Sequence, residues 1–362
     1  QGASIIRLDA IAYLWKQSGT SCIHLPQTHQ VVKIIRLVLE MAAPQVILIT
    51  ETNVLHKDNI SYFGDYDPET GLNDEAHMVY QFPLAPLVLH SLQAGSSARL
   101  HNWVESLNTE GIFFNFIASH DGIGILPASN ILSEAELEAV INQVINHGGM
   151  VSYRSNPDGT QTVYELNTTL YDAVNDPGHP NPDLDIARYI ASQVIMLSLA
   201  GVPGIYYNSL FGSRNSPENV NRTGHTRSIN REKFSLNELE TVLNDPGNIH
   251  TRVFEKYRHL LSIRTKQAAF HPCSQQYVVR LSDRIFGLER ESPDRSSVIL
   301  ILVNISSEYM EMSLDLNQRL LKNSKLLEDL ISGEKFTILN QQLSITLKPY
   351  QPLWLKELKN QK

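Results

Sequence analysis

The sequence has few cysteines, no long apolar run and no block of like charge. Two cysteines, Cys22 and Cys273, in 362 residues are too few for a disulfide framework or a zinc cluster, and they predict a reducing, cytoplasmic setting. No segment approaches the roughly 18 uninterrupted apolar residues of a membrane span, so we expect no membrane association. The net charge of −8 is dispersed along the chain, which argues against a nucleic-acid surface.

The chain does contain a regular alternation of short apolar runs and amphipathic stretches, up to about residue 271. The apolar runs predict buried parallel strands, and the amphipathic stretches predict helices that cover them. In the first of these helices one face, which we expect to pack on the sheet, carries Val31, Ile34, Ile35, Val38 and Met41. The predicted strands are 5–8, 46–49, 78–82, 112–118 and 204–207, and the predicted helices are about 28–43, 84–107, 133–148, 184–200 and 251–270.

Two segments rich in turn residues interrupt this alternation, and the sequence pattern changes near residue 272. The segments 150–182 and 208–231 predict long functional loops rather than linkers. Beyond residue 272, short β-prone runs alternate with turn residues, which indicates a small antiparallel domain. We therefore expect two units, residues 1–271 and residues 272–362.

Carboxylates recur where predicted strands end. Asp9 follows the first strand, Glu51 the second and Asp121 the fourth. In a barrel of parallel strands, catalytic residues gather at the carboxyl ends. No glycine-rich phosphate fingerprint follows any strand, which disfavours a doubly wound dinucleotide-binding sheet. The predicted fold class is α/β, a partial TIM (β/α)8 barrel, since only five predicted strands stand where a closed barrel needs eight.

These three carboxylates suit the cleavage of a glycosidic bond, which needs one ionised nucleophile and one protonated acid. Arg7 lies two residues before Asp9 on the same strand, so both side chains point to one side and Arg7 favours the charged form of Asp9. Glu51 has no cation beside it in the sequence and is the more natural acid. Taken alone, Asp9 could instead be an ordinary cap of the following turn.

Three short segments resemble signature regions of the α-amylase superfamily, namely Arg7-Leu-Asp9, Ile49-Thr-Glu51 and His120-Asp121. The resemblance implies that Asp9 is the nucleophile and Glu51 the general acid/base. It also implies that Asp121, with His120, binds the sugar and stabilises the transition state. A finer similarity, to the sucrose phosphorylase-like subfamily, is carried by His120-Asp-Gly-Ile-Gly124, Tyr164-Glu-Leu-Asn167 and Arg227-Ser-Ile-Asn-Arg231.

The subfamily resemblance implies a retaining α-glucoside phosphorylase. Such a glycosyltransferase converts sucrose, or a related α-glucoside such as glucosylglycerate, and phosphate to α-glucose 1-phosphate by double displacement. Its partners would be the small-molecule glucoside and inorganic phosphate as co-substrate, with no cofactor, metal, nucleic acid or membrane; the oligomeric state is not predicted. Arg227 would contact the bound glucose. Tyr164 and Arg154 are candidate anion contacts, although Arg154 can equally be read as a solvated loop cation.

Two departures from the subfamily pattern change the expectations. Glu165 stands where typical sucrose phosphorylases have glutamine, and the segment from Arg154 is closer to relatives that act on glucosylglycerate or glucosylglycerol, so sucrose need not be the substrate. The resemblance also begins at strand four of the barrel, which predicts strands 4 to 8 with two open edges, an incomplete sugar pocket and an inactive isolated chain. The alternatives are a hydrolase or transglucosidase of the same superfamily, and an inactive fragment.

Overall fold

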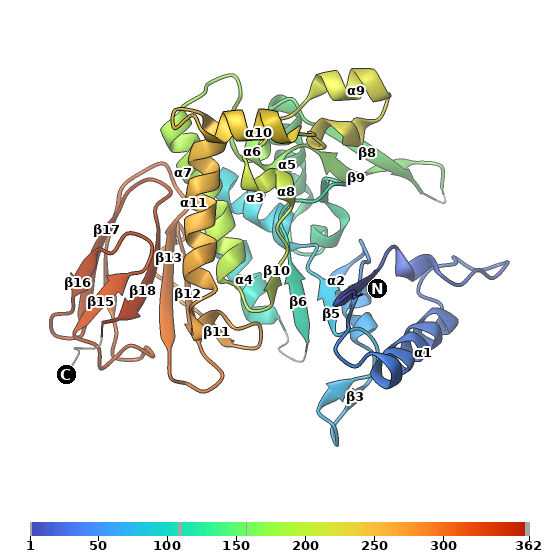
Figure 1. Ribbon diagram of the computed structural model, residues 1–362, viewed down its shortest axis with the longest axis horizontal. Helices are drawn as coiled ribbons and strands as arrows, with labels where there is room; N and C mark the ends of the chain where they lie inside the picture. Colours follow the sequence, from blue (N-terminus) through green and yellow to red (C-terminus); the bar gives the residue numbers. More distant parts are fainter. Residues whose placement is uncertain (1, 108–110, 157, 359–362) are drawn as a thin grey trace.

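Five short strands form a parallel sheet in the computed structural model, which describes residues 2–107, 111–156 and 158–358. The order of the strands in the sheet follows their order in the chain (Figure 1). The strands are β1 (Ile5–Leu8), β2 (Ile47–Thr50), β5 (Met78–Tyr80), β6 (Ile112–Asn115) and β10 (Val202–Pro203). The predicted parallel sheet is therefore confirmed. Among the described residues, β1 pairs only with β2, and β10 only with β6.

Helices make the crossovers that parallel neighbours require. The principal helices are α1 (Pro26–Ala42), α3 (Leu84–Ala94), α4 (Ala98–Ser106), α5 (Glu134–Asn146), α7 (Pro182–Ser198) and α11 (Ile249–Arg264). The capping box predicted for Ser133 and Glu136 is present and starts α5, because each residue satisfies a backbone N–H of the other. No helix in the described part of the chain is both long enough and apolar enough to span a membrane.

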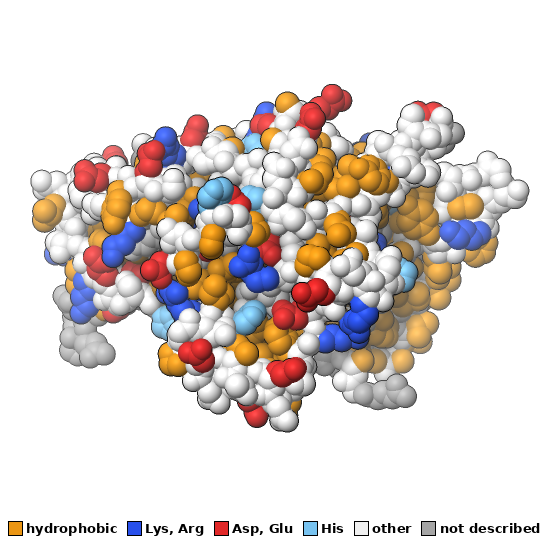
Figure 2. Space-filling view, turned by 90° about the horizontal axis from the view of Figure 1, so that it is seen from above, with side chains coloured by type: hydrophobic (Ala, Val, Ile, Leu, Met, Phe, Trp, Pro, Cys, Tyr) orange, Lys and Arg blue, Asp and Glu red, His pale blue; other side chains and the backbone are white. Residues whose placement is uncertain are grey.

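The buried face of α1 includes Ile35, as predicted, but otherwise differs from the predicted one. Val32 is buried and packs with Ile35 and Leu39 against the β1–β2 side of the sheet, whereas Ile34 and Val38 are exposed. The prediction failed because apolar residues extend around most of this helix, so their spacing alone does not select one face. A second apolar face remains uncovered, formed by Ile34, Leu37, Val38 and Met41. Hydrophobic side chains also gather at the right of Figure 2, the side on which α1 lies in Figure 1.

The segment 150–182 is not an irregular loop. It forms the hairpin of β8 (Met150–Ser155) and β9 (Gln161–Asn167), followed by α6 (Leu170–Val174). In turn, β9 pairs with the short strand β7 (Ile123–Gly124), which directly follows the Asp121 turn. The hairpin was missed because its turn residues dominate the local composition.

Other predicted boundaries also need correction. The segment 208–231 contains α8 (Tyr207–Leu210), α9 (Pro217–Thr223) and a 3-10 helix (Thr226–Asn230), and α10 (Leu236–Leu243) was not predicted. The last strand of the sheet covers only Val202–Pro203 rather than 204–207, because the chain turns into α8 at Tyr207. The strand predicted at 112–118 ends at Asn115, and the helix predicted at 251–270 ends at Arg264.

The C-terminal part forms the predicted antiparallel structure. Its larger sheet has the order β11, β12, β13, β18, β15, β16, and a separate pair joins β14 to β17. Their bounds are β11 (Gln275–Val278), β12 (Ile285–Glu291), β13 (Val298–Asn304), β14 (Met310–Asp315), β15 (Leu326–Asp329), β16 (Lys335–Thr337), β17 (Gln342–Leu347) and β18 (Pro352–Glu357). The division into units at residues 271 and 272 stays a prediction.

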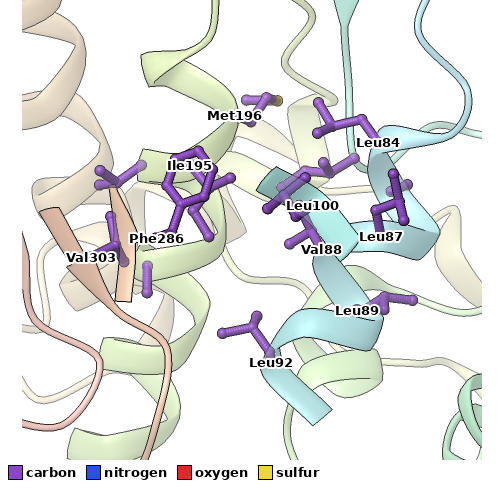
Figure 3. Close-up of a cluster of buried hydrophobic side chains, with 14 of the residues drawn as sticks. Leu84, Leu87, Val88, Leu89, Leu92, Leu100, Ile195, Met196, Phe286 and Val303 are labelled. Atoms are coloured by element: carbon purple, nitrogen blue, oxygen red, sulfur yellow. The ribbon is translucent and has the colours of Figure 1, made fainter. Parts of the chain in front are cut away.

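One hydrophobic core joins the helical layer to this sheet. Leu84 and Val88 of α3, Ile195 of α7, and Phe286 and Val303 of the antiparallel sheet belong to one buried cluster (Figure 3). Helices α7 and α11 lie between the two sheets in Figure 1. Because the cluster contains residues of both parts, neither part buries this cluster without the other.

A buried arginine reinforces this junction. Arg290 of β12 is fully buried, and its guanidinium donates to the carbonyl oxygens of Ser198 at 2.6 Å, His271 at 3.0 Å and Gln275 at 3.3 Å. Ser198 is the last residue of α7, where carbonyl groups lack partners within the helix and attract a cation. Arg290 therefore ties the end of α7 to the antiparallel sheet.

We expect Arg290→Ala to lower the free energy of unfolding by about 3 kcal/mol, because it leaves buried carbonyl groups without donors and opens a cavity. Urea denaturation of the chain, followed by circular dichroism, measures this loss. The matched control is Arg258→Ala, which removes an exposed arginine paired with Glu255 and should change stability by less than about 0.5 kcal/mol. Equal effects of the two substitutions would contradict the role assigned to Arg290.

Candidate active site

Parallel pairing brings Asp9 and Glu51 to neighbouring positions just beyond β1 and β2. Arg7 lies between them. Its Nη1 atom is 2.6 Å from Asp9 Oδ1, and its Nη2 atom is 3.7 Å from Glu51 Oε2. The predicted pairing of Arg7 with Asp9 is present, and the same guanidinium also approaches Glu51, which is distant from it in sequence.

The two carboxylates occupy different environments. The side chain of Asp9 is 73% exposed, whereas that of Glu51 is 14% exposed. Burial raises the pKa of Glu51 above the ordinary glutamate value, although a backbone hydrogen bond and the charge of Arg7 oppose this shift. That hydrogen bond comes from Ala10, whose N–H donates to Glu51 Oε2 at 2.8 Å and whose φ of 45° is left-handed. A carboxyl group with a raised pKa beside a solvated carboxylate is the arrangement that separates an acid from a nucleophile.

Asp121 lies in a cluster of cations. Arg227 Nη1 and Arg231 Nη2 lie 3.0 Å and 3.2 Å from Asp121 Oδ1. His120 Nε2 is 3.3 Å from the other carboxylate oxygen of Asp121. These contacts hold the third carboxylate in a fixed orientation, as hydrogen bonds to charged partners do.

Glu165 is almost fully buried and joins this cluster through Arg227. Its side chain is 5% exposed and receives a forked contact from Arg227, with Nη2 at 2.7 Å and Nε at 3.1 Å from Oε2. Burial raises the pKa of Glu165, and the hydrogen bond and charge of Arg227 oppose this shift. Glu165 thus touches Arg227, which in turn touches Asp121, so any effect of Glu165 on specificity acts through Arg227.

The two candidate anion contacts lie in different places. Tyr164 is half-buried, and burial raises the pKa of Tyr164 to about 12. Arg154 is exposed on β8, and its Nε donates across the hairpin to Thr162 Oγ1 at 3.4 Å. The structure does not bring Arg154 into contact with the three carboxylates. An anion-binding role for Arg154 stays a prediction.

Two site residues were missed by the sequence analysis. Tyr80, at the end of β5, accepts a hydrogen bond from Arg7 Nε at 2.8 Å. Arg231 donates to the carbonyl oxygen of His120 at 2.7 Å as well as contacting Asp121. Tyr80 lies inside the predicted strand 78–82 and ends the strand only in the structure, so the predicted strand ends did not mark it. Arg231 closes the motif that begins at Arg227.

A cleft lies among several of these groups. Its walls include Arg7, Glu51, Asp121 and Glu165, and Tyr80, Phe82 and Phe116 supply an aromatic part of the lining. The arrangement suits a sugar, which offers both hydroxyl groups and an apolar ring face. Within the described residues, no group of three or more His, Cys, Asp or Glu side chains could hold a metal ion. The absence of a metal or cofactor in the working site stays a prediction.

No family model matches the sequence. It is 44% identical to the glucosylglycerate phosphorylase of Spirochaeta thermophila over 98% of this chain and 60% of that protein. A solved sucrose 6F-phosphate phosphorylase from Thermoanaerobacter thermosaccharolyticum is 22% identical and superposes with a TM-score of 0.69, over 84% of this chain and 56% of that one. A solved α-amylase from H. orenii is 14% identical and superposes with a TM-score of 0.61, over 97% of this chain and 60% of that one.

The solved structures support an α-amylase-type fold, since both likenesses cover most of this chain. The relative from Spirochaeta thermophila gives a more specific likeness than the fold does, because its sequence similarity covers 98% of this chain, including the C-terminal β structure. The chain spans about 60% of the length of that relative. Over the part it spans, the chain is similar in sequence to glucosylglycerate phosphorylases and in fold to a sucrose 6F-phosphate phosphorylase and an α-amylase.

Proposed function

We propose that the protein that carries this region is a retaining α-glucoside phosphorylase, with glucosylglycerate as the first donor to test. One observation carries the proposal, namely the pair formed by solvated Asp9 and buried Glu51 on either side of Arg7. This pair has the chemistry that double displacement at a sugar requires. The named activity of the Spirochaeta thermophila relative supports glucosylglycerate as the donor.

In the first step, Asp9 attacks the anomeric carbon of the bound α-glucoside while Glu51 donates its proton to the leaving oxygen. A β-glucosyl ester forms on Asp9, and the acceptor part leaves with the proton. The raised pKa of Glu51 keeps the proton available at a pH at which an ordinary glutamate has lost it. Arg7 stabilises the charge of Asp9 before the attack.

In the second step, inorganic phosphate attacks the same carbon from the opposite face and releases Asp9 as a carboxylate. Two inversions give α-glucose 1-phosphate, so the configuration is retained. Phosphate is already ionised near neutral pH, so binding the anion and excluding water matter more than deprotonation by Glu51. Tyr164 and Arg154 remain the candidate contacts for the anion.

Asp121 would hold the glucosyl group and stabilise the positive charge of the oxocarbenium-like transition state. His120, Arg227 and Arg231 orient Asp121 from three directions. Arg227 uses its remaining edge to bind Glu165, which leaves it little freedom to bind a second anion. We therefore assign Arg227 to sugar binding through Asp121 rather than to phosphate binding.

We also propose that β1, β2, β5, β6 and β10 are strands 4 to 8 of an eight-stranded barrel. The outer edge of β1 has no strand beside it in the described part of the chain, and the second apolar face of α1 is exposed there. A preceding βα unit would cover both, and the curated relative is longer than the part matched here. The free thiols of Cys22 and Cys273 fit a reducing compartment such as the cytoplasm.

The assignment is tested with a chimera that joins this chain to the unmatched part of the Spirochaeta thermophila relative. Glucosylglycerate, glucosylglycerol and sucrose are each supplied with and without phosphate, and glucose 1-phosphate and free glucose are quantified. We expect glucose 1-phosphate to form only with phosphate, and most rapidly from glucosylglycerate. Free glucose at the same rate with or without phosphate would show a hydrolase. We expect the isolated chain to be inactive.

In the same chimera, Asp9→Asn should reduce turnover by about 10⁴-fold or more, because the neutral amide cannot form the glucosyl ester. Circular dichroism should show an unchanged fold, since the Asp9 side chain is largely exposed. The matched control is Asp283→Asn, an exposed aspartate away from the cleft, which should retain full activity. Activity of Asp9→Asn near that of the unaltered chimera would remove Asp9 from the mechanism.

Glu165→Gln should change the preference among the three glucosides by about tenfold and still allow formation of glucose 1-phosphate. The neutral amide cannot match the forked charge pair with Arg227, so the wall of the cleft beside Asp121 is altered. Competition assays with paired substrates measure the change. Glu238→Gln, at an exposed helix cap, is the control. An unchanged preference order would show that specificity is set elsewhere.

A further inference from the structure

A small cavity lies behind the turn that carries Asp121. Its walls come from the end of the β6 segment, from the start of α6, and from α7, α8 and the 3-10 helix at Asn230. A water-sized sphere fits inside, and its centre has about 10 Å³ in which to move. Two waters about 2.8 Å apart need more room than that. The cavity is therefore sized for one small occupant, and it is separate from the catalytic cleft except at their shared wall residue Ser119.

Four buried polar atoms of the wall have no hydrogen-bond partner among the residues that the structure describes. They are Tyr171 OH, Asn208 Oδ1, Ser213 Oγ and Asn230 Oδ1, and each residue is at most 2% exposed. Leaving such groups without partners costs roughly 1–3 kcal/mol each, so native structures rarely collect several of them in one place. All four residues line the same cavity, which indicates a ligand that these atoms share.

The surrounding hydrogen bonds fix which end of each amide faces the cavity. Asn208 Nδ2 donates to Asn230 O at 3.1 Å and to Tyr206 OH at 3.2 Å. Asn230 Nδ2 donates to Ser119 O at 2.9 Å. The amide nitrogens are thus occupied, so the two free amide atoms are acceptors. The two free hydroxyl groups, on Tyr171 and Ser213, can each donate.

We propose that this cavity binds one water molecule, which accepts from the hydroxyls of Tyr171 and Ser213 and donates to the amide oxygens of Asn208 and Asn230. Two donors and two acceptors are the complement of one water, and a buried water typically makes two to four hydrogen bonds. A cation would leave the two hydroxyl protons without acceptors, and an anion would face two amide oxygens. No charged side chain lines the cavity to balance either ion.

The water links segments that are far apart in the sequence and supports the turn of Asp121 from behind. Asn230, one of its four partners, also holds the carbonyl of Ser119, and the next residue, Arg231, holds the carbonyl of His120 at 2.7 Å. Tyr206 adds a hydrogen bond to Asn230 O at 3.0 Å. The site depends only on the fold, so it stands whether or not the proposed reaction is correct.

A crystal structure of the chain, or of the chimera, at about 1.8 Å resolution tests the site directly. We expect one electron-density peak within about 3.2 Å of at least three of the four atoms. A second data set from a crystal soaked in rubidium chloride should show no anomalous signal there. A cavity without a peak, or a peak with a rubidium signal, would overturn the proposal, since the first removes the ligand and the second makes it a cation.

A double-mutant cycle tests the same water in solution. Tyr171→Phe and Ser213→Ala should each lower the folding equilibrium constant about fivefold, because each removes one hydrogen bond to the water. Together they should lower it by less than the product of the two factors, since both act on one molecule. The control is Tyr257→Phe, since the Tyr257 hydroxyl bonds Gln193 and does not line the cavity. Combined with Ser213→Ala, it should lower the folding equilibrium constant by the product of the two single factors. If the Tyr171→Phe and Ser213→Ala factors also multiplied in the double variant, the result would contradict a shared ligand.

Discussion

Parallel pairing of five short strands decides where the polar groups at the strand ends of the candidate site lie. Because the strands run in the same direction, the residues that follow them meet at one edge of the sheet. Asp9 and Glu51 are 42 residues apart in the chain, yet the register that places Leu8 beside Thr50 makes them neighbours. The helices, the hairpin over β7 and the antiparallel sheet all serve to keep this edge in place.

Arg7 contacts both carboxylates, because the sheet brings Asp9 and Glu51 close together. One guanidinium is held by the hydroxyl of Tyr80 at its Nε atom, which leaves its two terminal nitrogens directed at Asp9 and Glu51. The planar fork of arginine suits this division, whereas a lysine could not serve three partners in fixed directions. The difference between the two carboxylates then comes from burial, which is a property of the fold rather than of any local motif.

The parts of the site that follow from local pattern were predictable from the sequence. The end of an apolar run marks the end of a strand, so Asp9, Glu51 and Asp121 could be placed on one edge without coordinates. The partners Tyr80 and Arg231 could not be placed with certainty, because their contacts join residues 73 and 110 positions apart. Nor could the burial of Glu165, because it depends on the unpredicted hairpin of β8 and β9 and on the pairing of β9 with β7. The apolar residues around α1 left its orientation undecided for a similar reason, since only a neighbour selects which face is covered.

The uncovered face of α1 affects how long this region would survive on its own in a cell. Ile34, Leu37, Val38 and Met41 present apolar side chains together on one surface, and β1 has an unpaired outer edge in the described part of the chain. Chaperones and proteases recognise surfaces of this kind, and unpaired strand edges promote aggregation. A copy of this region released on its own would therefore be short-lived, and its abundance would depend on how quickly that surface is covered after synthesis.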